Sequence, residues 1–172
     1  MNCSKIGHGG TLDPLASGVL PIAIGEATKT VSYVMDSEKK YEFTISWGYE
    51  TTTDDKEGSP TRISNKIPTK EDLDSCIPEF IGTIKQTPPD YSAVKIDGKR
   101  AYSIARFSEK RGIENQVDLK SREVNIHNLS LLSLSNNRAC FSILCGKGTY
   151  VRSLGRDLGR RLGSAGHISA LK

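Results

Sequence analysis

Residues 40–47 alternate between apolar and polar side chains, and this pattern constrains the fold more than any other segment. One face of the alternation carries Tyr41, Phe43, Ile45 and Trp47. A period of two residues is typical of a β-strand that buries one face. We therefore expect these residues to form a half-buried strand at the centre of the domain.

Three further segments have clear periodicity. Residues 121–135 and 138–144 are candidate strands on either side of Asn136-Asn137, a pair that favours a turn. Residues 149–162 predict an amphipathic helix. Its apolar side consists of Val151, Leu154, Leu158 and Leu162, and another side carries Arg152, Arg156 and Arg160 at intervals of four.

The remaining segments mix strands and helices irregularly. Thr69 and Asp72 predict a helix start, and Pro78 should shorten or kink that helix. The other expected elements are a short buried strand over 19–24, helices over 26–35 and 99–110, a loop over 48–61 and a strand over 91–96 that ends at an Asp97-Gly98 turn. Because strict βαβ alternation is absent, we expect an α+β (mixed α/β) domain with a largely antiparallel sheet flanked by helices.

Composition limits the class of protein. The 172 residues are enough for one domain with a sizeable core, and a net charge of +4 permits a polyanionic partner without requiring one. No stretch approaches the ~18 apolar residues of a membrane span, and the first residues lack the apolar core of a signal peptide. A cytoplasmic location is the default. None of the four cysteines forms a CxxC motif, which argues against a zinc site or a disulfide framework.

Residues 5–29 form a glycine-rich run with one acid near the N-terminus. Asp13 follows a Gly9-Gly10 pair and precedes Pro14. This arrangement can present a carboxylate at the floor of a cleft, because glycines allow a ligand to approach the backbone closely. Asp13 can equally cap a turn. The run lacks the phosphate-loop pattern GxxxxGK[ST], so nucleotide binding is poorly supported.

Two other side chains have both a functional and a structural interpretation. Tyr41 begins the apolar strand face, where it can be a core aromatic or a platform for a base. Arg152 falls in the first turn of a predicted helix, where the helix dipole does not favour a cation. Arg152 is therefore either solvated or paired with a specific anion.

Basic residues gather in the second half of the chain with tyrosines among them. The basic positions are Lys95, Lys99, Arg100, Arg106, Lys147, Arg152, Arg156, Arg160 and Arg161, and the tyrosines are Tyr91, Tyr102 and Tyr150. Phosphate contacts combined with aromatic stacking are a common way to bind RNA loops. The pattern permits RNA binding, although surface arginines are more often simply solvated.

These motifs together resemble the TruB family of tRNA pseudouridine-55 synthases. The resemblance runs in order through GHGGTLDPLASGVLPIAIGEATK, DSEKKYEF, PPDYSAVKIDGKRAY, GKGTYVRSLGRDLG and GSAGHISALK. It covers nearly the whole chain, and the first segment alone is highly specific. Relative to the family, residues 1–172 look like a pseudouridine synthase catalytic domain truncated at both ends, without a PUA-type domain.

The resemblance assigns roles to individual positions. It implies that Asp13 is the catalytic aspartate, that Tyr41 stacks on the target uracil and helps remove its C5 proton, and that Arg152 pairs with the aspartate. Substrate-binding positions by the same resemblance are His8, which packs into the tRNA T-loop, Leu171, which lines the uracil pocket, and Tyr91, Lys95 and Tyr150.

The implied activity is isomerisation of uridine 55, in the T-loop of tRNA, to pseudouridine. The N-glycosidic bond breaks, the uracil rotates, and C5 is joined to C1′, with no cofactor or metal. The resemblance leaves open whether the aspartate attacks C1′, attacks C6, or removes a C2′ proton. The expected partner is the tRNA T-stem-loop, the target base is flipped out, and a monomer is expected.

Two other functions remain open at this point. A tRNA-binding or tRNA-folding module without catalysis would bind RNA in a salt-dependent manner without turnover. An unrelated hydrolase that uses His8 and Asp13 would need a third catalytic partner, which the sequence does not reveal.

Overall fold

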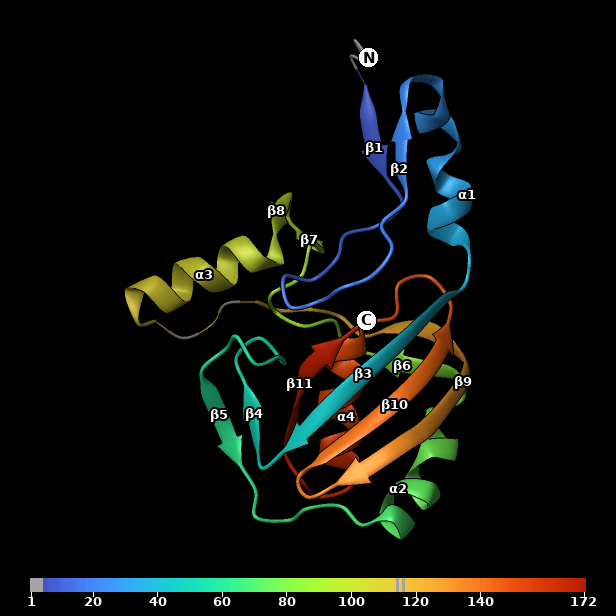
Figure 1. The fold of residues 1–172 in the computed structure, drawn as a ribbon. Helices are drawn as coiled ribbons and strands as arrows, with labels where there is room; N and C mark the ends of the chain where they lie inside the picture. The colour runs from blue at the N-terminus through green and yellow to red at the C-terminus, as the bar shows by residue number, and fades with distance from the viewer. Residues whose placement is uncertain (1–4, 114, 116) are drawn as a thin grey trace.

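The structure is a computed structural model that describes residues 5–113, 115 and 117–172. Its centre is a five-stranded sheet of order β11-β3-β10-β9-β6, in which all neighbours are antiparallel (Figure 1). The strands are β3 (Lys39–Trp47), β6 (Gly82–Gln86), β9 (Arg122–Ser135), β10 (Arg138–Cys145) and β11 (Gly166–Leu171). The predicted α+β fold with a largely antiparallel sheet is confirmed.

Strand β3 lies between β11 and β10, and its apolar face forms the centre of the core. Phe43, Ile45 and Trp47 are all at most 1% exposed, as the alternation predicts. Phe43 stacks on Phe141 of β10 with ring centroids 5.2 Å apart. The predicted hairpin is also present, and Asn136 takes a positive φ of 49° between β9 and β10.

Helices complete this core. Helix α4 (Val151–Arg161) packs against β11 and β3, while α2 (Lys70–Cys76) and the 3₁₀ helix η2 (Ile77–Phe80) pack against β9. The predicted start of α2 is confirmed by reciprocal hydrogen bonds between Thr69 and Asp72. Pro78 shortens the helix as expected, because the chain changes to 3₁₀ geometry there.

The N-terminal segment forms a separate ribbon. Strands β1 (Ile6–His8) and β2 (Ile22–Ile24) pair with each other and are followed by the 3₁₀ helix η1 (Gly25–Thr30) and by α1 (Val31–Asp36). These elements project beyond the end of the main sheet (Figure 1). The connection over residues 9–21 returns to the sheet, where the Ser17 amide donates to the Leu171 carbonyl at 3.0 Å.

Several of the expected local structures are wrong or incomplete. The helix expected over 26–35 begins as the 3₁₀ helix η1, and the helix expected over 99–110 begins only at Ala101. The buried strand expected over 19–24 is reduced to β2, and Val19 is 89% exposed because this ribbon pairs outside the main sheet. The loop expected over 48–61 contains β4 (Tyr49–Thr51) and the start of β5 (Pro60–Ile63). The strand expected over 91–96 is confined to β7 (Lys95–Ile96), which pairs with β8 (Lys99–Arg100) before α3 (Ala101–Arg111).

The structure also bears on membranes, thiols and metals. Within the described ranges, no helix is both long and apolar enough to cross a membrane. Cys76, Cys140 and Cys145 are free thiols, and Cys3 lies outside the described residues. Among the residues that the structure describes, no group of three or more His, Cys, Asp or Glu side chains is arranged to hold a metal ion.

Strand β11 has no clear alternation, and the sequence analysis did not predict it. It pairs with β3 from Gly166 opposite Trp47 to Leu171 opposite Phe43. A Cβ atom on Gly166 would lie 2.8 Å from both the Trp47 ring and the Ile45 side chain. Glycine therefore allows β11 to enter the sheet close to two buried side chains.

We predict that Gly166→Ala lowers the free energy of unfolding by roughly 1–3 kcal/mol, because the added methyl overpacks the core. Gly146→Ala is the matched control, since its Cβ would meet nothing closer than 3.6 Å. Urea unfolding followed by tryptophan fluorescence measures both. Equal stability of the two variants would contradict this account of β11.

Candidate active site

Asp13 lies at the start of a turn that aims the loop over residues 9–21 toward the sheet. The Ala16 amide donates to the Asp13 carbonyl at 2.8 Å, with Pro14 in the second position of the turn. Proline favours that position because its fixed φ fits the turn. Ala16 also forms a parallel bridge with Leu171. The backbone of Asp13 thus caps a turn, which leaves its carboxylate available for other contacts.

The carboxylate of Asp13 forms a two-point ion pair with Arg152. The Arg152 Nε and one terminal nitrogen donate to the two Asp13 oxygens, each at 2.8 Å. The Arg152 side chain is 6% exposed and the Asp13 side chain 29% exposed. Two parallel charge-assisted hydrogen bonds fix the plane of the carboxylate as well as its position. The predicted pairing of these two residues is present.

Arg152 is held by two further segments of the chain. Its guanidinium donates to the Thr53 carbonyl at 3.1 Å and to the Tyr91 carbonyl at 3.2 Å. It also lies 3.7 Å from the buried carboxylate of Asp55. A buried guanidinium needs such partners, because burial removes its hydration.

Arg152 is presented by a fixed start of helix α4. Gln86, at the end of β6, is 1% exposed. Its side-chain amide donates to the Tyr150 carbonyl at 3.1 Å and accepts from the Tyr150 amide at 2.8 Å. Since Tyr150 precedes the first helical residue, Gln86 satisfies an amide that the helix start leaves unpaired. The Tyr150 carbonyl also accepts from the Leu154 amide at 3.1 Å.

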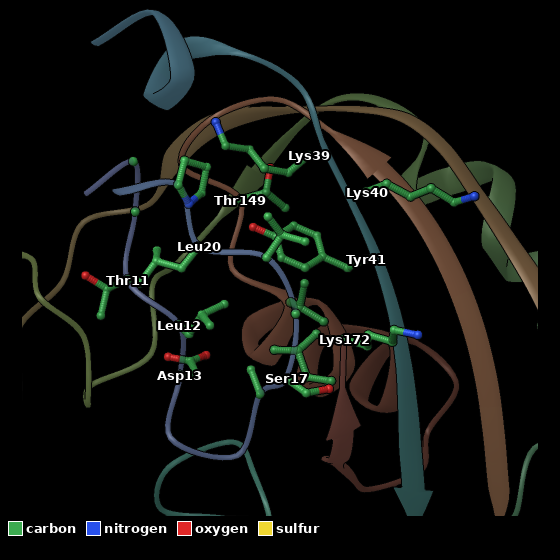
Figure 2. Close-up of a pocket in the computed structure, with 18 of the residues that line it drawn as sticks. Thr11, Leu12, Asp13, Ser17, Leu20, Lys39, Lys40, Tyr41, Thr149 and Lys172 are labelled. Atoms are coloured by element: carbon green, nitrogen blue, oxygen red, sulfur yellow. The ribbon is translucent and has the colours of Figure 1, made fainter. Parts of the chain in front are cut away.

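A cavity of about 620 Å³ opens between the loop over 9–21 and strand β3. Figure 2 shows the Tyr41 ring on β3 facing the loop that carries Leu12 and Asp13. Tyr150 and Leu171 also line the cavity. Its walls thus combine aromatic and aliphatic surface with three acidic residues, Asp13, Glu38 and Glu42. Its size falls within the ~300–1,000 Å³ range of small-ligand sites.

Burial raises the pKa of Tyr41, and the negative charges of Cys145 and Asp13 act in the same direction. Burial also raises the pKa of the Cys145 thiol. The Tyr41 hydroxyl therefore stays protonated at neutral pH. It can take a proton from a ligand only if it passes its own proton on, whereas its ring can stack in either state.

Three predicted binding residues lie elsewhere. His8 is exposed, its Nδ1 lies against the Gly10 carbonyl, and it is not among the residues lining the cavity. Lys95 is exposed on β7, also away from the lining. Tyr91 contributes its carbonyl to Arg152, while its hydroxyl donates to Glu109 at 2.7 Å and has a pKa raised to about 12 by burial and that bond.

The expected basic surface is largely tied up in ion pairs. Arg156 bonds Asp54, and Arg160 bonds Glu50. Arg161 bonds Glu79, and Lys147 lies 2.9 Å from Asp36. Arg156 is only 11% exposed, whereas Arg160 and Arg161 are 56% and 58% exposed, so RNA binding by this face of α4 stays a prediction. The hydrolase alternative gains nothing, because His8 and Asp13 do not share the cavity.

Sequence reasoning missed Asp55 and Gln86. Asp55 belongs to a polar segment with the pattern TTTDDKEG, which looks like a solvated loop. The adjacent acids Asp54 and Asp55, together with a predicted helix that carries arginines at intervals of four, are a signal that could have suggested ion pairs between the two segments. Gln86 is the last residue of β6, and no sequence motif surrounds it. Only the three-dimensional structure shows its contact with Tyr150.

Comparisons with known proteins identify the family and the fold. Residues 1–151 match the family described as TruB family pseudouridylate synthase (N terminal domain). The chain is 53% identical over 172 residues to tRNA pseudouridine synthase B of Brucella ovis, covering 99% of this chain and 51% of that protein. It is 56% identical over 169 residues to the Rhizobium etli protein of the same name, covering 98% and 53%. The chain thus spans about half the length of the curated relatives it matches.

Solved structures share the fold. A chain of a Cbf5-Nop10-Gar1 complex matches with a TM-score of 0.69 and 29% identity, covering 99% of this chain and 40% of that one. A chain of an H/ACA RNP bound to a substrate RNA containing 2′-deoxyuridine matches with a TM-score of 0.66 and 24% identity, covering 99% and 38%. At that identity, the second match concerns the fold alone.

We predict that Gln86→Leu lowers the free energy of unfolding by about 1–3 kcal/mol, because it leaves the Tyr150 amide without a partner and removes one of the two donors to the Tyr150 carbonyl. Lys85→Leu, at an exposed position of the same strand, is the control and is expected to lose less. Chemical denaturation of the two variants checks the order. A Gln86→Leu variant as stable as the parent protein would refute the role given to Gln86.

Proposed function

Because the chain belongs to the TruB family of pseudouridylate synthases, we propose that it isomerises a uridine of tRNA to pseudouridine with Asp13 as the catalytic carboxylate. The observation that carries the proposal is the two-point ion pair between Asp13 and Arg152 beside a cavity lined by Tyr41. The family resemblance points to uridine 55 of the T-loop as the target. The name of the relatives supports tRNA as the substrate.

The reaction is balanced within the nucleotide. The C1′–N1 bond breaks, the uracil turns, and a C1′–C5 bond forms. C5 then loses its proton, and N1 gains one. No electrons enter or leave. The protein must therefore supply a carboxylate that acts on the nucleoside, a surface that holds the uracil, and a group that carries one proton away from C5.

Asp13 is suited to the first requirement. Arg152 occupies one side of its carboxylate with two donors, which fixes its direction. Asp13 also lines the cavity. Each of the three chemical paths open to the family uses an ionised carboxylate held beside the flipped nucleoside, so this geometry serves all of them.

Tyr41 and Leu171 are suited to the second requirement. Both line the cavity, Tyr41 with an aromatic ring and Leu171 with an aliphatic side chain. Flipping a base out of a folded loop costs a few kcal/mol, which stacking on an aromatic ring offsets. The lining also carries charges of both signs, from Lys39, Lys40, Lys172, Glu38 and Glu42.

We predict that Asp13→Asn lowers pseudouridine formation by at least about a thousandfold, as expected for a residue that acts directly on the substrate. The assay incubates the full-length protein with a T-stem-loop tritiated at uridine C5 and measures tritium release. Asp74→Asn, an exposed acid on α2, is the control and should retain activity. Undiminished product from Asp13→Asn would overturn the proposal.

The same assay separates this proposal from a tRNA-binding module without catalysis. Such a module would bind the stem-loop in a salt-dependent manner in both the parent protein and Asp13→Asn, with no product from either. That result would favour the alternative.

We predict that Tyr41→Phe lowers kcat about 100-fold with little change in KM, if the hydroxyl relays the C5 proton. The ring remains in this variant, so stacking is preserved. Single-turnover kinetics on the tritiated stem-loop measure the effect. A kcat within about threefold of the parent value would mean that Tyr41 acts through its ring alone.

A further inference from the structure

Three arginines on one face of α4 contact a single polar segment over residues 50–55. Arg160 donates to Glu50 at 2.8 and 3.1 Å, and one turn earlier Arg156 donates to Asp54 at 2.8 Å. One further turn earlier lies Arg152, which bonds the carbonyl of Thr53. The three arginines thus join one face of the helix to the segment over residues 50–55 at successive helical turns.

Arg156 repeats the two-sided connection that Arg152 makes. Its terminal nitrogens donate to Asp54 and to the Thr87 carbonyl, the latter at 2.9 Å. Arg152 likewise donates to residue 53 and residue 91. Both arginines thus hold the same two segments, residues 51–58 and 87–91, against α4. Arg156 is 11% exposed and makes this connection outside the cavity that Asp13 lines.

Asp54 combines an uncommon backbone conformation with a buried charge. Its φ is +61°, in the left-handed region that aspartate adopts more readily than most residues but less readily than glycine. Its carboxylate is buried, and burial raises its pKa to about 6 although Arg156, Arg152 and Arg160 act in the opposite direction. Strained and buried polar groups of this kind persist where they order a neighbouring functional group.

We propose that Asp54 and Arg156 are positioning residues, which hold residues 51–58 on α4 so that the Arg152 guanidinium keeps the orientation that presents two donors to Asp13. The link is short. Asp54 lies between Thr53, whose carbonyl accepts from Arg152, and Asp55, whose carboxylate lies 3.7 Å from it. If the segment shifts, Arg152 loses both contacts at once.

Several charged groups surround Asp54, and they determine its response to pH. They are Arg152, Arg156, Arg160 and Asp157 on α4, Glu50 and Asp55 on its own segment, and Asp90 and Glu109 around the neighbouring cavity. Burial also raises the pKa of Asp90. Because the raised pKa of Asp54 favours the neutral form in the folded state, lowering the pH through about 6 removes the ion pair without destabilising the fold.

The test measures the geometry directly and needs no substrate. In ¹⁵N NMR spectra, the Arg152 Nε–H exchanges slowly with water while Asp13 accepts from it. We expect Asp54→Asn to speed this exchange about tenfold, the size of a typical coupling between neighbouring groups. Glu79→Gln is the matched control, since it removes an ion pair with Arg161 on the same helix and should leave Arg152 unchanged.

Activity supplies the second readout, and it rests on the proposed function. Asp54→Asn should lower kcat about tenfold with KM unchanged, and the loss of activity below pH ~6 should disappear from its pH profile. If the parent protein forms no pseudouridine, the proposed function fails, while the exchange measurement still decides the role of Asp54.

A folding defect in Asp54→Asn would not end the test. Asp54→Gly removes the same carboxylate and relieves the left-handed strain, so it should fold and show the same faster exchange. Unchanged exchange of the Arg152 Nε–H in a folded Asp54 variant, or an equal change in Glu79→Gln, would overturn the proposal.

Discussion

The buried guanidinium of Arg152 is the interaction on which the site depends. Through it, helix α4 meets the loop that carries Asp13 and the segments that carry Thr53 and Tyr91. These segments are far apart in the sequence and belong to no common strand. A cation taken out of water must recover its hydrogen bonds from the protein, so satisfying Arg152 also brings the surrounding loops together. The same contacts that lower the cost of burial also orient the carboxylate of Asp13.

The sheet makes this arrangement possible by fixing both ends of the helix that presents Arg152. At the start, Gln86 of β6 holds the backbone of Tyr150. Beyond the end, Gly166 lets β11 enter beside Trp47 and Ile45. The apolar core thus positions the polar site, because a shift of α4 would have to break both contacts.

Much of the fold could be predicted from the sequence, since strong periodicity marks elements that bury one face. The alternation over residues 40–47 and the helix over 149–162 depend on burial against a continuous core, and both were predicted correctly. Strands β1, β2, β4 and β5 lie in small ribbons outside the main sheet. Their side chains carry no strong pattern, because much of their surface is exposed or paired with charges. Local sequence therefore does not distinguish them from loops.

The site, like the fold, could be predicted from the sequence only in part. Asp13 and Arg152 were found through a motif, but their contact joins residues 139 positions apart, and no local pattern reports it. For the arginines of α4, RNA binding and simple solvation both stayed open, because sequence shows charge without showing its partner. The acids that neutralise them lie in a segment that looks solvated. Charged residues at intervals of four therefore indicate one face of a helix. Whether that face binds a ligand or forms ion pairs within the protein depends on the segment packed against it, which the sequence does not show.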